Sequence, residues 1–227
     1  ECDLGVNCIP RGLSGEFISH GLEAGQLVET GIPVSSCYDE CVGRTEARRM
    51  LGLEESGPLV LLMCGSMGCG PMEWLAGELS RALPEGGMIA ALCGTNKKLR
   101  AALDSDGLPG LMSIGYTQQV SLWMDAADLI ISKPGGLTSS EAMAKRLPMI
   151  IIDAVPGCET KNLEYLTARG CAVTAPTEEI PGLALSLLRS GAAGSMRANM
   201  EEYFPHGSAG RVWDAVCGVT EGKRVLV

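Results

Sequence analysis

The residues best suited to chemistry form one ten-residue segment, KPGGLTSSEA, at positions 133–142. Gly135 and Gly136 leave the backbone flexible and unobstructed, so a ligand can approach its amide groups closely. A helix that starts near Leu137 would direct its unpaired amides and its dipole at the same place, which favours a diphosphate. Glu141, one turn into that helix, could accept hydrogen bonds from a vicinal diol such as a ribose. The segment therefore predicts a nucleotide-sugar site.

A purely local role explains part of the same pattern. Thr138 or Ser139 can cap the helix, and Thr138 with Glu141 has the T-x-x-E spacing of a capping box. The spacing fits both interpretations, and both stay open at this point.

Two further loops contain more than a turn requires. CGSMGCG at 64–70 follows an apolar run, and its glycines would admit an anion to the backbone. Their order matches neither of the glycine-rich phosphate motifs, so a tight turn explains the loop equally well. PGCETKN at 156–162 offers Glu159 and Asn162 to sugar hydroxyls, although an ordinary helix start is the simpler interpretation.

The elements that would position these loops alternate regularly. Continuous apolar runs, typical of strands buried on both faces, occur at 58–65, 88–94, 111–116, 128–132, 148–153 and 171–175. Helices are predicted at 72–83, 96–104, 118–126, from 137 onward and near 160–169, with two or three more at the end. The pattern predicts an α/β fold, a doubly wound parallel sheet of the Rossmann-like type. Ligands bind such sheets at the carboxyl ends of the strands.

The first thirty residues have a different character. CDLGVNCIP (2–10) is predicted as a strand and GEFISHGLEAGQLVETG (15–31) as a helix with its turn, but a lone unit of this kind cannot bury both faces. GIPVSSCYDE (31–40) has the Gly-Pro punctuation of a linker, which places a boundary between residues 31 and 55. We assign 1–30 to the tail of a preceding domain with its linker, and 31–227 to the domain that contains the site.

Composition argues against several classes of function and location. The net charge of −9 gives the surface no electrostatic reason to bind nucleic acid, and disfavours anionic membrane for this part of the protein. The 10 cysteines stand mostly alone in apolar runs, which with the absence of a signal peptide or spanning run predicts reduced thiols and a cytoplasmic location. No metal is expected, because Cys37 and Cys41 lack a second pair at zinc spacing. His20 and His206 are interpreted as structural or surface residues.

Three segments together resemble a known family. IGYT (114–117), DLIISKPGGLTSSEA (128–142) and PGCETKN (156–162) occur in the order and spacing of one group of glycosyltransferases. The resemblance is to the carboxyl-terminal domain of monogalactosyldiacylglycerol synthases and processive diacylglycerol glucosyltransferases. It extends more distantly to the lipid II N-acetylglucosaminyltransferase, and covers 31–34 through 208–216.

The resemblance implies one half of a GT-B fold, in which two Rossmann-like domains face a cleft and the carboxyl-terminal one binds a UDP-sugar. It implies that the backbone at Gly115 and Tyr116 holds the uracil and that Glu141 holds the ribose. It places the diphosphate at 135–138 with 65–68 beside it, and the hexose at Glu159 and Asn162. The implied site residues are Gly65, Ser66, Gly68, Gly115, Tyr116, Gly135, Gly136, Leu137, Thr138, Glu141, Cys158, Glu159 and Asn162. Because Cys158 stands where these enzymes usually have Gln, and a thiol cannot replace an amide's hydrogen bonds, the hexose is left open.

The implied reaction is transfer of a hexosyl group from a UDP-hexose to the hydroxyl of a diacylglycerol-type lipid. Backbone amides would stabilise the leaving diphosphate without a metal, and no further cofactor is implied. The catalytic base and the lipid-facing surface would lie in the preceding domain, so this chain alone is expected to bind UDP without turnover. Peripheral membrane contact would belong to the full-length protein. The alternatives are a UDP-sugar epimerase of the same fold and a non-catalytic nucleotide-binding module.

Overall fold

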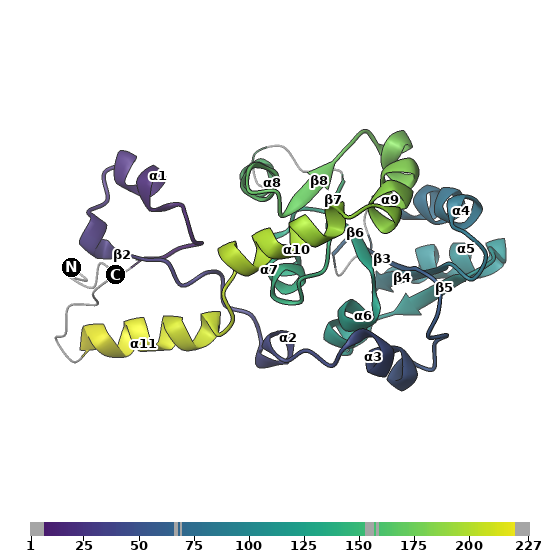
Figure 1. The fold of residues 1–227 in the computed structure, drawn as a ribbon, viewed down its shortest axis with the longest axis horizontal. Helices are drawn as coiled ribbons and strands as arrows, with labels where there is room; N and C mark the ends of the chain where they lie inside the picture. Colours follow the sequence, from purple (N-terminus) through teal and green to yellow (C-terminus); the bar gives the residue numbers. More distant parts are fainter. Residues whose placement is uncertain (1–6, 66–67, 69, 153–156, 158, 221–227) are drawn as a thin grey trace.

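A six-stranded parallel sheet forms the centre of the computed structural model, which describes residues 7–65, 68, 70–152, 157 and 159–220 (Figure 1). The strands stand in the spatial order β5-β4-β3-β6-β7-β8. Their bounds are β3 Leu59–Met63, β4 Met88–Gly94, β5 Leu111–Gly115, β6 Leu129–Ser132, β7 Met149–Ile151 and β8 Ala172–Thr174. All six predicted strands are therefore confirmed: β4 has the predicted bounds, and the other strands are one to three residues shorter than predicted.

The strand order creates a switch point at the centre of the sheet. The chain steps outward from β3 through β4 to β5, returns to the centre at β6, and steps the other way through β7 to β8. Right-handed crossovers in opposite directions place helices on opposite faces, as Figure 1 shows. The carboxyl ends of β3 and β6 thus adjoin at the point where sheets of this type bind ligands.

The helices between the strands follow the prediction closely. Their bounds, with those of the later helices, are α4 Met72–Ala82, α5 Lys97–Asp106, α6 Val120–Ala126, α7 Gly136–Ala144, α8 Thr160–Ala168, α9 Ile180–Arg189, α10 Ala192–Tyr203 and α11 Ser208–Thr220, with a 3-10 turn η2 at Thr177–Glu179. Helix α4 packs against α5 and α9. The three helices that end this list match the predicted carboxyl-terminal group.

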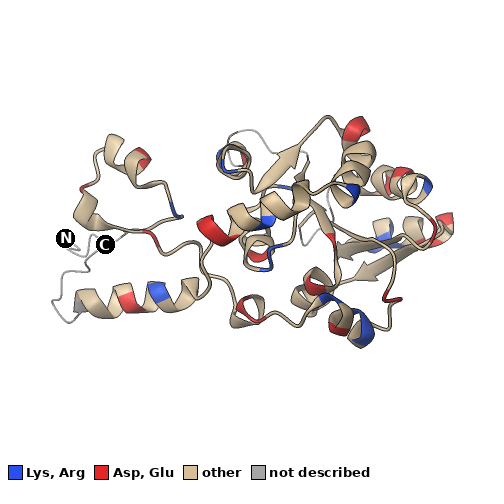
Figure 2. Ribbon diagram, viewed as in Figure 1, with Lys and Arg blue, Asp and Glu red and all other residues tan. Residues whose placement is uncertain are grey.

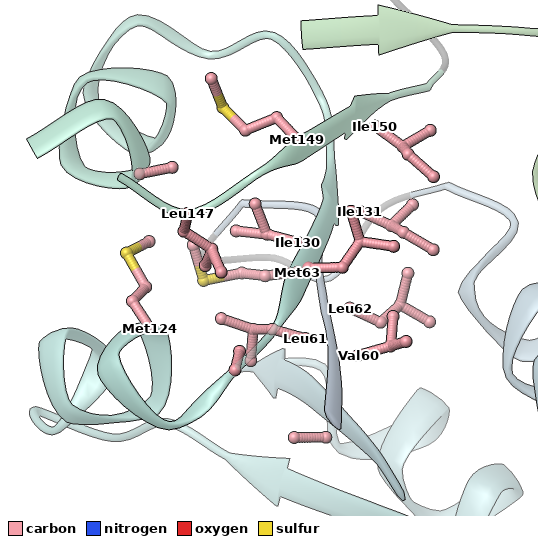
Figure 3. Packing of buried hydrophobic residues seen from close by; sticks show 14 of the residues in the cluster. Val60, Leu61, Leu62, Met63, Met124, Ile130, Ile131, Leu147, Met149 and Ile150 are labelled. Carbon is pink, nitrogen blue, oxygen red and sulfur yellow. The ribbon is translucent and has the colours of Figure 1, made fainter. Parts of the chain in front are cut away.

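The core forms where the apolar runs predicted it. Every residue of β3 and β6 is buried, because both faces of these central strands are covered. Figure 3 shows Met124 of α6 and Leu147 pointing toward Leu61 and Ile130 of the two strands. Burying side chains of this size contributes roughly 1.5–3 kcal/mol each relative to leaving them exposed, so this layer fixes the strand ends that frame the site.

The amino-terminal segment forms a small separate sheet. Strands β1 (Asn7–Cys8) and β2 (Leu27–Val28) pair in parallel, with α1 (Ser14–Ser19) and a 3-10 turn η1 (Ala24–Gln26) between them. The helix predicted over 15–31 was wrong beyond Ser19, because Gly21 takes a φ of +96° that ends the helix. Residues 2–6 of the predicted strand lie outside the described residues.

The segment predicted as a linker, 31–40, contains the short helix α2 (Ser36–Asp39), and α3 (Arg44–Leu51) follows it within the range given for the boundary. Helix α3 packs against α6. Its Arg48 is fully buried and pairs with Asp128 at 2.8 Å. Helix α3 therefore covers part of one face of the sheet beside α6.

Charged residues lie on the periphery of the fold. Figure 2 shows acidic and basic positions interspersed on the helices around the sheet, while the central strands are uncharged. In this view the Lys and Arg positions of the described residues do not form the continuous basic stripe that nucleic-acid binding needs. Among the described residues, no helix is long and apolar enough to cross a bilayer.

Candidate functional site

A cavity of about 180 Å³ lies at the carboxyl ends of the central strands. The loops after β3 and β5, the end of β4 and the first turns of α7 all line it. Its lining includes five predicted residues, Gly65, Gly115, Tyr116, Thr138 and Glu141, together with Tyr38. The structure thus brings together residues more than seventy positions apart in the sequence, at the switch point of the sheet.

Helix α7 directs its amino end at this region. Its N-cap is Gly135, in an extended conformation and without a side-chain cap. The first amide bonded inside the helix is that of Ser139, which donates to the Gly135 carbonyl at 2.9 Å. The amides of Gly136, Leu137 and Thr138 precede that ladder and are therefore the ones suited to an anion.

The local interpretation of the same residues was wrong. Thr138 lies inside the first turn of α7, three positions after the N-cap, so Thr138 and Glu141 do not form a capping box. Among the described residues, the buried Ser139 hydroxyl has no hydrogen-bond partner, so it does not cap the helix either. Thr138 and Glu141 instead share one helix face, at i and i+3, and that face lines the cavity.

Glu141 is the acidic group of the cavity. Burial raises the pKa of its carboxyl above the ordinary value, and a hydrogen bond from the Tyr38 hydroxyl opposes part of that rise. Burial, followed by the neighbouring carboxylate, raises the pKa of the Tyr38 phenol. The phenol therefore keeps its proton near neutral pH and can act as a donor. Burial has removed part of the water around the Glu141 carboxylate, and hydrogen bonds from a polar ligand could take the place of that water.

The loop before α7 is anchored from a neighbouring helix. Asn162 of α8 donates from Nδ2 to the carbonyl oxygen of Pro134 at 2.8 Å. A Cβ added at Gly136 would lie 3.9 Å from the same nitrogen, so the amide group sits directly beside the loop. Asn162 thus fixes the loop that presents the amides.

The other predicted residues are placed less uniformly. Gly68 is buried, with a φ of +53°, and a Cβ added there would lie 2.8 Å from the Cys93 carbonyl, which indicates a packing role. Glu159 is the N-cap residue of α8, and the Leu137 side chain is 66% exposed beside the α7 amides. Ser66 and Cys158 lie outside the described residues.

A buried ion pair supports the far end of α7. The Lys145 ammonium lies 2.8 Å from Asp125 of α6, with both side chains almost wholly buried. Lys145 also donates to the carbonyl of Glu40, and Asp125 accepts from the amide of Val42 at 3.4 Å. This network holds the segment after α2 against α6 and α7, and so holds Tyr38 over the cavity.

The sequence analysis missed Tyr38 in the cavity wall and Arg100 beside the cavity. Tyr38 lies in a segment interpreted as linker, and nothing local marks its contact with Glu141. Arg100 of α5 lies against Gly115, since a Cβ added there would be 3.1 Å from a guanidinium nitrogen. Its position one turn into a helix after a strand was the available signal, because such helices begin at the ligand-binding edge.

Larger hollows occur elsewhere on the molecule. One of about 430 Å³ lies between α1 and α8, and one of about 620 Å³ lies near Arg44 and Arg197 at the amino ends of the strands. The smaller cavity is the better candidate because it joins Thr138 in the first turn of α7, the half-buried Glu141 and the switch point, whereas Gly136 and Asn162 line the hollow between α1 and α8. Ligand pockets usually measure about 300–1,000 Å³, so it would enclose part of a nucleotide sugar. Within the described part of the chain, no group of three or more His, Cys, Asp or Glu could hold a metal ion.

The sheet order and this cavity define a Rossmann-like α/β protein with a ligand site at the switch point. A family model described as the glycosyltransferase family 28 C-terminal domain matches residues 59–197, more than half of the chain. The chain belongs to this family.

Curated relatives agree with the family match. The chain is 32% identical over 170 residues to a processive diacylglycerol beta-glucosyltransferase of Staphylococcus carnosus, covering 74% of this chain and 43% of that protein. It is 37% identical over 159 residues to the chloroplastic monogalactosyldiacylglycerol synthase 1 of Arabidopsis thaliana, covering 66% and 30%. The chain thus spans less than half the length of these relatives.

A solved structure shows the same fold at low sequence identity. A putative UDP-N-acetylglucosamine 2-epimerase from Listeria monocytogenes superposes with a TM-score of 0.70 at 15% identity, covering 96% of this chain and 61% of that chain. The GT-B type of fold expected from the sequence is therefore confirmed.

Proposed function

We propose that this chain is the donor-binding part of a glycosyltransferase that moves a hexosyl group from a UDP-hexose to a diacylglycerol-type lipid hydroxyl. The observation that carries the proposal is the cavity that joins Glu141 and Thr138 to the strand ends at Gly65 and Gly115. The names of the two curated relatives supply the reaction class and the lipid. Residues 1–30 would be the tail of the acceptor domain, and the protein would act in the cytoplasm, with any membrane contact made by the longer protein.

The chemistry follows from the groups present. The diphosphate would lie at the amides of Gly136, Leu137 and Thr138, where the helix dipole favours negative charge. As the glycosidic bond to UDP breaks, charge grows on that diphosphate, and preorganised amides stabilise it without reorganising. Glu141 would accept hydrogen bonds from the ribose diol, and Glu159 and Asn162 would face the hexose.

Calorimetry with UDP tests the proposal. The native chain should bind UDP, and Glu141→Ala should weaken binding about tenfold or more, because hydrogen bonds to a charged group are worth roughly 1.5–3 kcal/mol. Glu46→Ala is the matched control, since Glu46 is an exposed glutamate on α3 that pairs only locally with Arg49. No UDP binding by the native chain would refute the proposal, and equal effects of the two variants would refute the role of Glu141.

The epimerase alternative is favoured by one finding, the high structural similarity to the Listeria protein. An epimerase needs acid–base groups beside the sugar and no lipid acceptor. Incubation of the longer protein with UDP-N-acetylglucosamine, followed by analysis for the 2-epimer, separates the two functions. We expect no epimer there, and a glycolipid product when a UDP-hexose and diacylglycerol are supplied instead.

A further inference from the structure

Tyr38 differs from the other residues of the cavity because it precedes the sheet altogether. It lies on α2, which packs against α7, and it comes before the family match that begins at residue 59. Its phenol and the Glu141 carboxylate line the same cavity, where each group shifts the pKa of the other. A contact between two segments about a hundred positions apart therefore sits inside the candidate site.

The backbone on both sides of Tyr38 is held in place. Ser121 of α6 donates from its hydroxyl to the Cys37 carbonyl at 2.6 Å. The Asp39 carboxylate accepts from the backbone amide of Gly207 at 3.0 Å. The segment that carries Tyr38 is thus fixed by two different parts of the domain, which holds the phenol at the cavity beside the carboxylate.

A carboxylate that binds a diol must present its free lone pairs at a fixed angle. One donor from the protein occupies part of its accepting capacity, restricts its rotation and leaves the remaining lone pairs for the ligand. From the shared cavity and the packing of α2 on α7, we propose that the Tyr38 hydroxyl donates to Glu141 and that Tyr38 is thereby the positioning residue that orients this carboxylate toward the ribose diol of the nucleotide. This inference rests on the proposed function of the site.

The first test compares two ligands on Tyr38→Phe, which removes one oxygen atom. Affinity for UDP should fall about tenfold, equivalent to about 1.4 kcal/mol. Affinity for 2′-deoxy-UDP should fall less than about twofold, because one of the two diol contacts is already missing. Tyr165→Phe is the matched control, since its hydroxyl donates to the Arg11 carbonyl at 3.0 Å, remote from the cavity.

The second test is a pH profile of uridine binding, which avoids the titration of phosphate. Two phenols line the cavity with Glu141, Tyr38 from α2 and Tyr116 from the loop after β5, and Cys37 is adjacent to Tyr38. A hydrogen bond to the carboxylate favours its charged form, so its loss raises the pKa of Glu141 further. Uridine affinity should therefore fall on acidification at a higher pH in Tyr38→Phe than in the native chain.

The outcomes separate the two proposals. If the native chain does not bind UDP, the proposed function fails and this inference fails with it. If the native chain binds but Tyr38→Phe matches it in ligand preference and pH midpoint, only the inference is overturned. Should Tyr38→Phe not fold, fluorotyrosine labelling of the four tyrosines gives a second measurement. UDP must then shift the Tyr38 fluorine resonance more than 2′-deoxy-UDP does, and equal shifts overturn the inference.

Discussion

Replacing Asn162 by alanine should weaken binding of the diphosphate and leave the affinity for the nucleoside nearly unchanged. Its Nδ2 donates to the Pro134 carbonyl at 2.8 Å, and Pro134 is buried. Removing the donor leaves a buried carbonyl without that partner, which costs about 1–3 kcal/mol of folding free energy. The loop that begins α7 then loses its anchor, so its amides are less well preorganised for the anion.

Calorimetry with two ligands measures the effect. UDP affinity should fall about tenfold, or about 1.4 kcal/mol, whereas uridine affinity should change less than about twofold. Chemical denaturation should show the loss of stability in the same samples. Asn199→Ala is the matched control, because Asn199 makes the same kind of bond, to the Gly170 carbonyl at 3.1 Å, away from the site.

Two results would refute this reasoning. Equal losses of UDP and uridine affinity would show that Asn162 acts on the whole site and not on the diphosphate loop. A stability loss like that of Asn199→Ala with native UDP affinity would show that the anchor does not affect ligand binding.

Three further changes test the energetics of the fold. Lys145→Met should cost about 3–5 kcal/mol in chemical denaturation, because it leaves the buried Asp125 carboxylate without its charge partner. The pKa of Glu141 is raised in the folded state, so the stability that this residue contributes is lost as pH rises through that pKa. Glu141→Gln should therefore stabilise the chain at pH 7 and give no gain in stability below about pH 4. Gly57→Ala should cost about 2 kcal/mol or more, since its φ is +79° and a Cβ would lie 2.2 Å from the Gly86 carbonyl oxygen.

Each change has a control on the same fold. Arg49→Met removes an exposed ion pair and should leave stability nearly unchanged. Glu46→Gln should not reproduce the pH-dependent gain, and Gly77→Ala, in mid-helix with its nearest atom 3.9 Å away, should not destabilise. A stability loss for Lys145→Met as small as that for Arg49→Met would contradict the argument about the buried ion pair. A stability gain for Glu141→Gln that persists at pH 3 would contradict the argument about its pKa, and an unchanged stability for Gly57→Ala would contradict the argument about its backbone.

The sheet could be predicted because its information is local. The six strands are continuous apolar runs, and burial on both faces is the physical reason for that composition. The loop before α7 was also visible, since Gly135 and Gly136 place flexible backbone at a strand end. By contrast, β2 has only two residues, too few for any periodicity to register.

The features that could not be predicted from the sequence depend on contacts between residues far apart along the chain. Helix α3 contains two adjacent arginines, which suggest a surface, yet Arg48 is buried because Asp128 and several carbonyls receive its guanidinium. Tyr38 likewise acquires its role from Glu141 on a helix that forms much later in the sequence. The capping-box interpretation failed for a local reason, since Gly135 could adopt the N-cap conformation three residues earlier.

The most direct measurement is a crystal structure of this chain with UDP. The proposed function predicts the diphosphate at the amides of Gly136 to Thr138, the ribose hydroxyls on Glu141, and the uracil against Gly115 and Tyr116. UDP bound instead in the hollow between α1 and α8, or bound with its ribose away from Glu141, would contradict it.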